Sequence, residues 1–218
     1  MKNLSTKTQP HVLTVQRELE RMIAAGELQG GDRINESALA LKLGMSRGPI
    51  REACRTMEQT GVLRSAINRG FFVREISLRE ALDIYDVRSK LSGMAGRLAA
   101  ANASSAQLAE LEGIVNRMDA ALEAEDIGAY YPLNVEFHMC LIACADNHKL
   151  NQLWPTLESE LHLFRRQGLV LPGSLRASNY EHRAIVAALR AGDAAAAERL
   201  MNQHIQSGKA RFLRTITA

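Results

Sequence analysis

The sequence has few cysteines and no long apolar run, and each absence excludes a class of protein. Its 218 residues include only three cysteines, Cys54, Cys140 and Cys144, which do not make the disulfide framework of a small secreted protein. No apolar run approaches the roughly 20 residues that cross a bilayer. The first residues also lack the apolar stretch of a secretory signal. We therefore expect a cytoplasmic protein that does not enter a membrane.

The positive charge of the chain is concentrated at one end. Residues 1–75 hold 12 Lys and Arg against 8 Asp and Glu, whereas residues 76–218 hold 15 against 16. A basic surplus confined to one segment is typical of a module that faces nucleic acid. Because 46% of the residues are hydrophobic, the chain can also build a substantial core. These numbers favour one large or two modest domains, with DNA or RNA as the partner of the first.

Three helices are predicted near the N-terminus, and a tight turn joins the second to the third. Apolar residues recur at helical spacing over residues 12–25, and glycines follow that segment. Asn35 is a suitable cap for a second, short helix through Leu43. Gly44 and Met45 then form a turn into a third helix that begins at Ser46. This order of elements is the helix-turn-helix pattern.

The third helix carries arginines on one face. Ser46 is predicted to cap it through its hydroxyl, and Pro49 fits the first turn, where its missing N–H costs nothing. Arg47, Arg51 and Arg55 recur every four residues and so share a face. Arginines so placed can hold phosphates or guanine edges with paired hydrogen bonds. A solvated charged face is the simpler interpretation of an isolated helix, but the preceding turn favours DNA contact.

A β-hairpin is predicted after this helix. Residues 62–65 and 71–74 are suited to two short strands, and Asn68-Arg69-Gly70 supplies turn residues that tolerate positive φ. The alternative is an ordinary surface hairpin. Its position directly after a helix-turn-helix favours a wing, with Arg69 at its tip reaching a minor groove or a phosphate.

The N-terminal segment resembles the winged helix-turn-helix of the GntR family of bacterial transcription regulators. The resemblance covers residues 11–75 and rests on the following segments: Gly26-Glu27-Leu28, Gly31-Asp32-Arg33-Ile34-Asn35-Glu36, Leu39-Ala40, Leu43-Gly44-Met45-Ser46-Arg47-Gly48-Pro49-Ile50-Arg51-Glu52-Ala53 and Arg69-Gly70-Phe71. It implies that the chain binds an operator in double-stranded DNA. The DNA-binding residues that it implies are Ser46, Arg47, Gly48, Pro49, Arg51, Arg69 and Gly70.

The chain departs from the family pattern at two glycines. Gly30 stands where the family usually has proline, which loosens that corner. Gly48 stands where the family usually has threonine, which removes one hydroxyl near the DNA. We expect the second change to shift base readout onto Arg47 and Arg51.

The rest of the chain is helical in pattern, so the fold class is mainly α: a winged helix-turn-helix over residues 1–76 and an antiparallel all-α bundle of about six helices over residues 77–218. Capping boxes are predicted at Ser77–Glu80 and Ser178–Glu181, and a further cap at Ser104 with Gln107. The predicted helices cover residues 78–102, 104–124, 127–145, 149–167, 178–192 and 193–213.

Three histidines fall on three different helices of the predicted bundle. His138, His182 and His204 each have apolar neighbours at helical spacing. A single such histidine is usually a core residue with its hydrogen bonds satisfied, but three that converge can bind zinc, nickel or iron. The sequence leaves both interpretations open. Cys140 lies about 200° around the helix from His138, so we expect Cys140 and Cys144 to be small buried residues and not ligands.

The second segment is similar to the FCD effector domain of the FadR subgroup of this family. The matching segments are Ile84-Tyr85-Asp86-Val87-Arg88, Phe137-His138, Asp146-Asn147, Glu181-His182-Arg183-Ala184-Ile185 and Gln203-His204-Ile205. Six helices instead of seven indicate the VanR-like branch. The resemblance implies a site for a divalent metal ion, zinc, nickel or similar, held by the residues Asn134, His138, His182 and His204.

The resemblance also implies a ligand for this domain. In the family the cavity accepts a small organic acid, and Arg88 matches an arginine that pairs with its carboxylate. A salt bridge within the protein is an equally good interpretation of Arg88. Asn134 stands where the family has aspartate, so we expect weaker metal binding or a changed metal preference. Because some members bind effectors without metal, a metal-free sensor stays open.

We therefore expect a homodimeric transcription regulator, a repressor, that binds a pseudo-palindromic operator and responds to a small organic acid. A metal-dependent enzyme is the alternative from another class. It is disfavoured because a DNA-binding module precedes the site and because Glu136 lies off the His138 face. A purely architectural DNA-binding protein, whose bundle serves only to dimerise, is the third interpretation.

Overall fold

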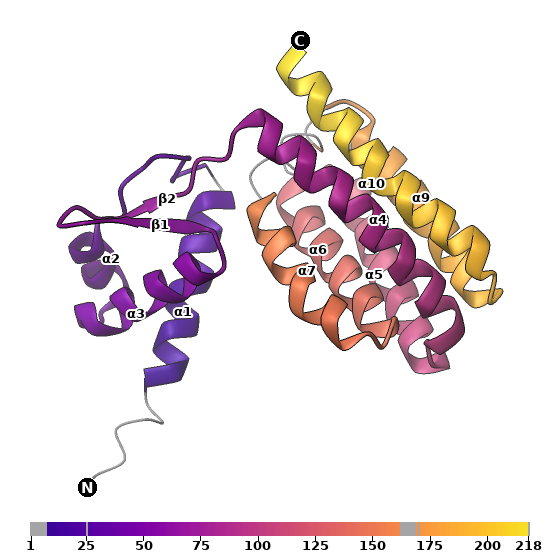
Figure 1. The fold of residues 1–218 in the computed structure, drawn as a ribbon, viewed down its shortest axis with the longest axis horizontal. Coiled ribbons are helices and arrows are strands. Elements are labelled where there is room, and N and C mark those ends of the chain that lie inside the picture. The colour runs from indigo at the N-terminus through magenta and orange to yellow at the C-terminus, as the bar shows by residue number, and fades with distance from the viewer. Residues whose placement is uncertain (1–7, 25, 162–168, 170, 218) are drawn as a thin grey trace, which may run out of the picture. The chain divides into compact units, whose positions relative to one another are not determined.

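The chain folds as two compact units in a computed structural model that describes residues 8–24, 26–161, 169 and 171–217 (Figure 1). The units comprise Met1–Ser77 and Leu78–Ala218. Among the described residues, no helix combines the length and the apolar character that crossing a membrane requires.

The N-terminal unit is a winged helix-turn-helix. Its two strands form an antiparallel hairpin in which Leu63 lies opposite Val73 and Ala66 lies opposite Gly70. The three helices and the hairpin predicted from the sequence are therefore confirmed. The elements are α1 (Thr8–Ala24), α2 (Glu36–Leu43), α3 (Arg47–Gln59), β1 (Leu63–Ala66) and β2 (Gly70–Val73).

Local chemistry explains the turn between α2 and α3. The Asn35 side chain accepts a hydrogen bond from the Ala38 N–H at 3.0 Å, as expected of a cap. Gly44 ends α2 with φ of +63°, a left-handed conformation that glycine adopts without steric cost. The chain then reverses and enters α3.

The predicted cap of α3 is wrong in one respect. Ser46 occupies the cap position in an extended conformation, but its side chain makes no capping hydrogen bond. A capping hydroxyl accepts from the second or third helical N–H, and Pro49 at the third position has no N–H to donate. Ser46 therefore begins the helix by backbone conformation and not through its hydroxyl.

The wing is tied to α3 through both backbone and side chains. The Ser65 N–H of β1 donates to the Glu58 carboxylate of α3 at 2.9 Å. Apolar residues from the helices and the strands fill the core of the unit. Its buried hydrophobic residues include Val15, Leu19, Ile23, Leu39, Ile50, Ala53, Cys54, Met57, Leu63, Phe71 and Val73.

The C-terminal unit is a bundle of helices, and its described residues include no strand. Helix α10 packs along α4, and α5 packs along α6 (Figure 1). The predicted end of the fourth bundle helix at Gln167 lies outside the described residues. The described helices are α4 (Leu78–Asn102), α5 (Ser105–Glu123), α6 (Ile127–Cys144), α7 (His148–Glu160), α9 (Ser174–Arg190) and α10 (Ala194–Thr217).

The capping predictions in this unit have mixed outcomes. The capping box at Ser104 and Gln107 is present. The predicted box at Ser178 is wrong, because α9 begins four residues earlier, after Gly173 in a left-handed conformation with φ of +75°. Ser178 and Glu181 consequently lie inside α9, where they face other helices instead of a helix end.

Small residues on α4 allow α10 to approach closely. A Cβ atom on Gly96 would lie 2.6 Å from the Ala197 carbonyl oxygen of α10. The Ser92 hydroxyl of α4 also donates to the Met201 carbonyl of α10 at 3.0 Å. These contacts of Gly96 and Ser92 with α10 form a seam between the two helices. The seam fixes the position of α10 in the bundle, and α10 carries His204.

Candidate functional site

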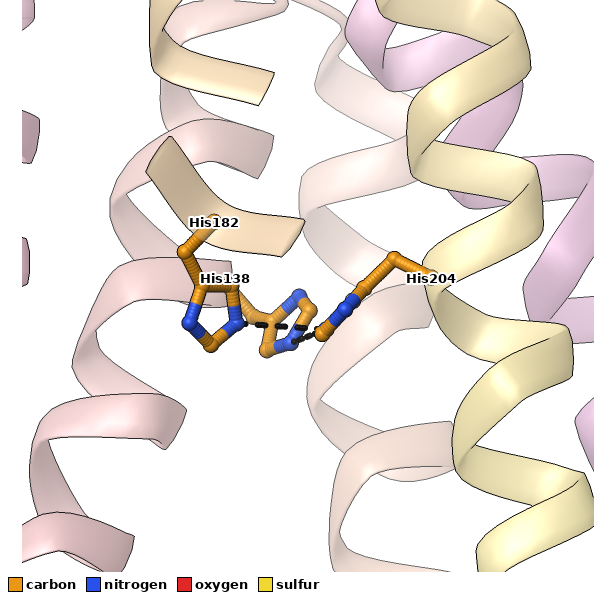
Figure 2. A group of neighbouring side chains, drawn as sticks. All are labelled: His138, His182 and His204. Atoms are coloured by element: carbon orange, nitrogen blue, oxygen red, sulfur yellow. Dashed lines mark hydrogen bonds between the residues drawn. The ribbon is translucent and has the colours of Figure 1, made fainter. Parts of the chain in front are cut away.

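The three histidines converge inside the C-terminal unit. Figure 2 shows His138 of α6, His182 of α9 and His204 of α10 turned toward one another. The Nε2 atom of His204 lies 3.2 Å from Nε2 of His182 and 3.2 Å from Nε2 of His138. All three side chains are buried, and their ligand atoms lie within 4.8 Å of one another. The structure thus provides the convergence on which the metal prediction depends.

A carboxylate fixes the orientation of His204. Glu181 lies 2.6 Å from Nδ1 of His204, and Arg211 donates to both of its oxygens at 2.9 and 3.1 Å. Burial raises the pKa of Glu181, but the hydrogen bonds from His204 and Arg211 outweigh it and lower that pKa to about 2. Ionised Glu181 therefore accepts a hydrogen bond from Nδ1–H of His204 and fixes the ring with Nε2 facing the other two imidazoles.

The Nε2 atom of His204 has two close nitrogen neighbours. It lies 3.2 Å from a nitrogen of each of the other two imidazoles, whereas one ring nitrogen has a single hydrogen or a single lone pair. Around a tetrahedral zinc ion, with bonds of about 2.0–2.1 Å, two ligand nitrogens stand about 3.3 Å apart. The two separations from His204 are close to this value, and all three ligand atoms lie within 4.8 Å of one another, so the arrangement is compatible with a shared divalent cation.

Asn134 lies in the same pocket as two of the three histidines. Its side chain is 4% exposed, and its Oδ1 atom has no hydrogen-bond partner among the described residues. It precedes His138 on α6 by one helical turn and lines the same pocket as His138 and His204. An amide oxygen is a neutral ligand, so the four residues would bring no negative charge to an ion.

A pocket adjoins the histidines. Its cavity volume is about 30 Å³, which is room for about one water molecule in this arrangement of the side chains. Two arginines, Arg88 and Arg211, contribute to its wall, and Tyr85, Leu169 and Ile205 give it an apolar side. Polar groups beside an apolar wall are typical of a small-molecule site, but the cavity is much smaller than the roughly 300–1,000 Å³ of such sites.

Arg88 forms the internal salt bridge that was the alternative to effector binding. Its side chain is fully buried, and Nη2 lies 2.6 Å from the Glu158 carboxylate of α7. The guanidinium also packs over Trp154 at 4.6 Å from the ring centroid. Burial lowers the pKa of Arg88 to about 10. Its Nε–H has no hydrogen-bond partner among the described residues, although Arg88 lines the pocket.

The other candidate ligands lie elsewhere. In the part of the chain that the structure describes, the cluster of metal-binding side chains consists of the three histidines alone. Cys144 is buried, as expected, whereas Cys140 is only half-buried. Glu136, considered as a general base in the enzyme interpretation, pairs with Arg117 of α5 at 2.5 Å.

The predicted DNA-binding residues lie at the start of α3 and at the end of the hairpin turn. The residues Ser46, Arg47, Gly48, Pro49 and Arg51 occupy the first turns of α3 or precede it directly, whereas Arg69 and Gly70 close the hairpin. The side chains of Arg47 and Arg51 are 61% and 56% exposed. Gly70 has φ of +90°, which accounts for glycine at this turn.

Sequence reasoning missed several charged partners. Glu36 pairs with both Arg47 and Arg51, Glu158 pairs with Arg88, and Arg211 supports Glu181. Arg88 and Glu158 are 70 residues apart, and no local spacing connects them. For Glu181, its place directly before His182 was the available signal, but it was assigned to a cap.

Comparison with known proteins agrees with both units. Residues 12–73 match the model of the bacterial regulatory proteins of the gntR family, and residues 83–207 match the FCD domain. A probable D-xylose utilization operon transcriptional repressor of Paenarthrobacter nicotinovorans is 33% identical over 184 residues, covering 84% of this chain and 80% of the relative. The structure of E. coli McbR/YncC has a TM-score of 0.83 at 26% identity and covers 94% of this chain and 97% of its own.

Together, these findings define a class of transcription regulator in which a winged helix-turn-helix is joined to a helical FCD domain. The chain belongs to the GntR family, in its FadR-like subgroup. It is a DNA-binding transcriptional regulator and not an enzyme.

Proposed function

We propose that this regulator is a homodimeric repressor whose operator affinity depends on a divalent metal ion and a small organic acid in the histidine pocket. The observation that carries the proposal is the convergence of three imidazole nitrogens, two of them from His138 and His204, which line one pocket with Asn134. The Asn134 side-chain oxygen has no hydrogen-bond partner among the described residues. The relative in Paenarthrobacter nicotinovorans is described as a repressor, which supports repression over activation for this protein. As a bacterial regulator of this family, the protein would act in the cytoplasm.

In this proposal each group of the pocket has a defined task. The three histidines and Asn134 would hold the ion, and Glu181 would keep the Nε2 lone pair of His204 directed at it. The ion would supply a Lewis-acid position for a carboxylate oxygen. The Arg88 Nε–H and the Arg211 guanidinium offer donors for the rest of an anionic ligand.

Regulation then requires a difference in affinity between two arrangements of the protein. An effector changes DNA binding only if it binds better to one arrangement than to the other. The proposal places DNA contact in α3 and the wing and effector contact in the bundle, which are two distinct sites.

A metal-free sensor is the second candidate, and Asn134 is the observation that favours it. Without the aspartate, the site has no anionic ligand, and Asn134 and the histidines could contact a hydroxylated acid directly. Metal content per chain, measured by elemental mass spectrometry on untagged protein purified without chelator, separates the two. About one ion per chain, lost in His182→Ala, supports the metal site. No ion after soaking with zinc, nickel or manganese supports the metal-free sensor.

The DNA-binding part of the proposal is tested by Arg51→Ala. Arg51 is exposed on α3, so its loss should leave folding intact and abolish specific operator binding. Circular dichroism should match the wild type, and a titration of operator duplex at fixed salt should show only non-specific affinity. Unchanged operator affinity would contradict the assignment.

A further inference from the structure

One carboxylate in the N-terminal unit contacts both arginines proposed to read DNA. Glu36 is the first residue of α2, and its side chain is only 10% exposed. Its Oε2 atom lies 3.2 Å from Nη2 of Arg47 and 3.3 Å from Nε of Arg51. Each arginine lies on α3, one helical turn from the other. Glu36 therefore links the short helix α2 to the arginine face of α3.

The same carboxylate also approaches the turn end of the hairpin. Its Oε1 atom lies 3.7 Å from the position that a Cβ atom would take on Gly70, the first residue of β2. The Arg33 guanidinium approaches that position at 3.8 Å. Glu36 thus stands where α2, α3 and the hairpin meet, beside three residues of the predicted DNA surface.

Stability explains only part of this arrangement. The Glu36 carboxylate is nearly buried and needs partners, but Arg47 and Arg51 are more than half exposed, and solvent screening limits what each ion pair adds to the free energy of unfolding. A carboxylate at a surface that meets phosphates also weakens DNA binding through repulsion. The presence of the Glu36 carboxylate at this surface is therefore better explained by its effect on the orientation of Arg47 and Arg51.

The contacts with Glu36 use one nitrogen of each arginine and leave its other N–H groups available for DNA. A guanidinium has five N–H donors in a rigid plane. When Nε of Arg51 faces Glu36, the two terminal nitrogens stay available as a fork, which is the geometry that reads O6 and N7 of guanine. Arg47 faces Glu36 through one terminal nitrogen and keeps its other donors. Restricting both side chains also lowers the entropy that they lose on binding a base.

We infer that Glu36 is a positioning residue that directs Arg47 and Arg51 at base edges and thereby sets sequence specificity. The inference rests on the proposed DNA contacts of these two arginines. It separates specific from non-specific affinity: without Glu36 the arginines still attract phosphates, but they no longer present a fixed pattern of donors. Loss of Glu36 should therefore reduce discrimination between sequences and not DNA binding as such.

The test uses the full-length protein and duplexes that it selects itself. Binding sites are enriched from a random-sequence pool with the wild type, and dissociation constants are then measured at fixed salt on a selected duplex and on a scrambled one. For Glu36→Gln, we expect about tenfold weaker binding to the selected duplex. Binding to the scrambled duplex should be unchanged or tighter, because one negative charge is gone.

Two further variants separate position from charge. Glu36→Asp keeps the charge but shortens the reach by one methylene, so it should lose discrimination without any gain on the scrambled duplex. Glu52→Gln is the matched control, because it removes an exposed carboxylate from α3, where no ion pair joins Glu52 to either arginine among the described contacts. It should leave the ratio of the two dissociation constants at the wild-type value.

The outcomes distinguish this inference from the proposal on which it rests. If Arg51→Ala still discriminates between the selected and the scrambled duplex, the proposed DNA contacts are wrong, and so is the role of Glu36. If Arg51→Ala no longer discriminates between the duplexes but Glu36→Gln and Glu36→Asp still do, the positioning role alone is overturned. An equal change on both duplexes, in either direction, also overturns it, since a purely structural or purely electrostatic residue would act in that way. Melting curves of each variant identify a loss of fold.

Discussion

At the residue scale, Asn134 is the departure from the family pattern with the clearest chemical consequence. The proposed ligands are three neutral imidazoles and one neutral amide, so no anionic ligand offsets the charge of a divalent ion. Glu181 carries a negative charge nearby, but it acts through His204 and is itself neutralised by Arg211. The affinity of the site for metal should therefore be limited by the residue at this position.

We predict that Asn134→Asp raises zinc affinity at least tenfold. A carboxylate replaces the amide with little change of volume and supplies the charge that the donor set lacks. Competition with a chromogenic zinc chelator at constant pH measures the change. His182→Ala in the same background should remove the gain, and equal zinc affinities for Asn134→Asp and the wild type would contradict the assignment of Asn134 as a ligand.

Gly48 permits a second prediction at this scale. It lies in the first turn of α3, and a Cβ atom there would meet only the Ser46 hydroxyl, at 3.9 Å. Since alanine restricts the unfolded chain more than glycine does, Gly48→Ala should raise the free energy of unfolding by about 0.5 kcal/mol. Urea unfolding of the full-length protein measures this. A decrease in stability would show that the start of α3 needs the freedom of glycine.

At the element scale, the seam between α4 and α10 decides where His204 lies. Glycine at position 96 allows the two helices to approach so closely that an added methyl group would overlap the Ala197 carbonyl and approach Met201 Cγ at 2.9 Å. Backbone atoms of a packed helix cannot yield as a flexible side chain can. The helices would have to separate, and α10 would carry His204 away from its partners.

Gly96→Ala should consequently lower the free energy of unfolding by about 1–3 kcal/mol and weaken metal binding as well. Gly113→Ala is the matched control, because Gly113 also lies inside a bundle helix, α5, but a Cβ atom there meets nothing within 4 Å. That variant should be neutral or more stable by up to about 1 kcal/mol. Chemical denaturation compares the two, and similar effects of both substitutions would exclude close packing as the cause.

At the scale of the whole molecule, the metal site should couple ligand binding to stability. A ligand that binds only the folded state adds RT ln(1 + [L]/Kd), or about 2.7 kcal/mol at one hundred times its Kd. Removal of the ion by a chelator should therefore lower the melting temperature of the C-terminal unit by several degrees. His182→Ala should melt at the same temperature with and without chelator. No shift in the wild type would count against a bound ion.

Much of the fold could be predicted because helices and turns depend on neighbours in the chain. The 3.6-residue spacing located α4 from Leu78 to Asn102, and Asn35 marked the start of α2 through its own side chain. A prediction was wrong where the sequence offered two possible starts for the same helix. Ser178 is followed by glutamate three residues later, as in a capping box, but Gly173 begins the helix earlier.

The candidate sites could be predicted only in part. Periodicity placed His138, His182 and His204 on three helices, and family resemblance suggested a shared role. The short contacts between their Nε2 atoms required the bundle, because 44 residues separate His138 from His182 along the chain. The charged partners of the two sites depend on tertiary packing in the same way.

By itself, the sequence determined the two kinds of unit, the order of their helices, the arginine face of α3 and the placement of three histidines on three helices. These properties follow from composition and from spacing within one element. Only the tertiary structure decided that Glu36 holds Arg47 and Arg51, that Glu158 engages Arg88, and that Glu181 orients His204. The physical reason is that ion pairs and metal sites need atoms within about 3 Å of each other. Separate helices come that close only after their apolar faces have packed.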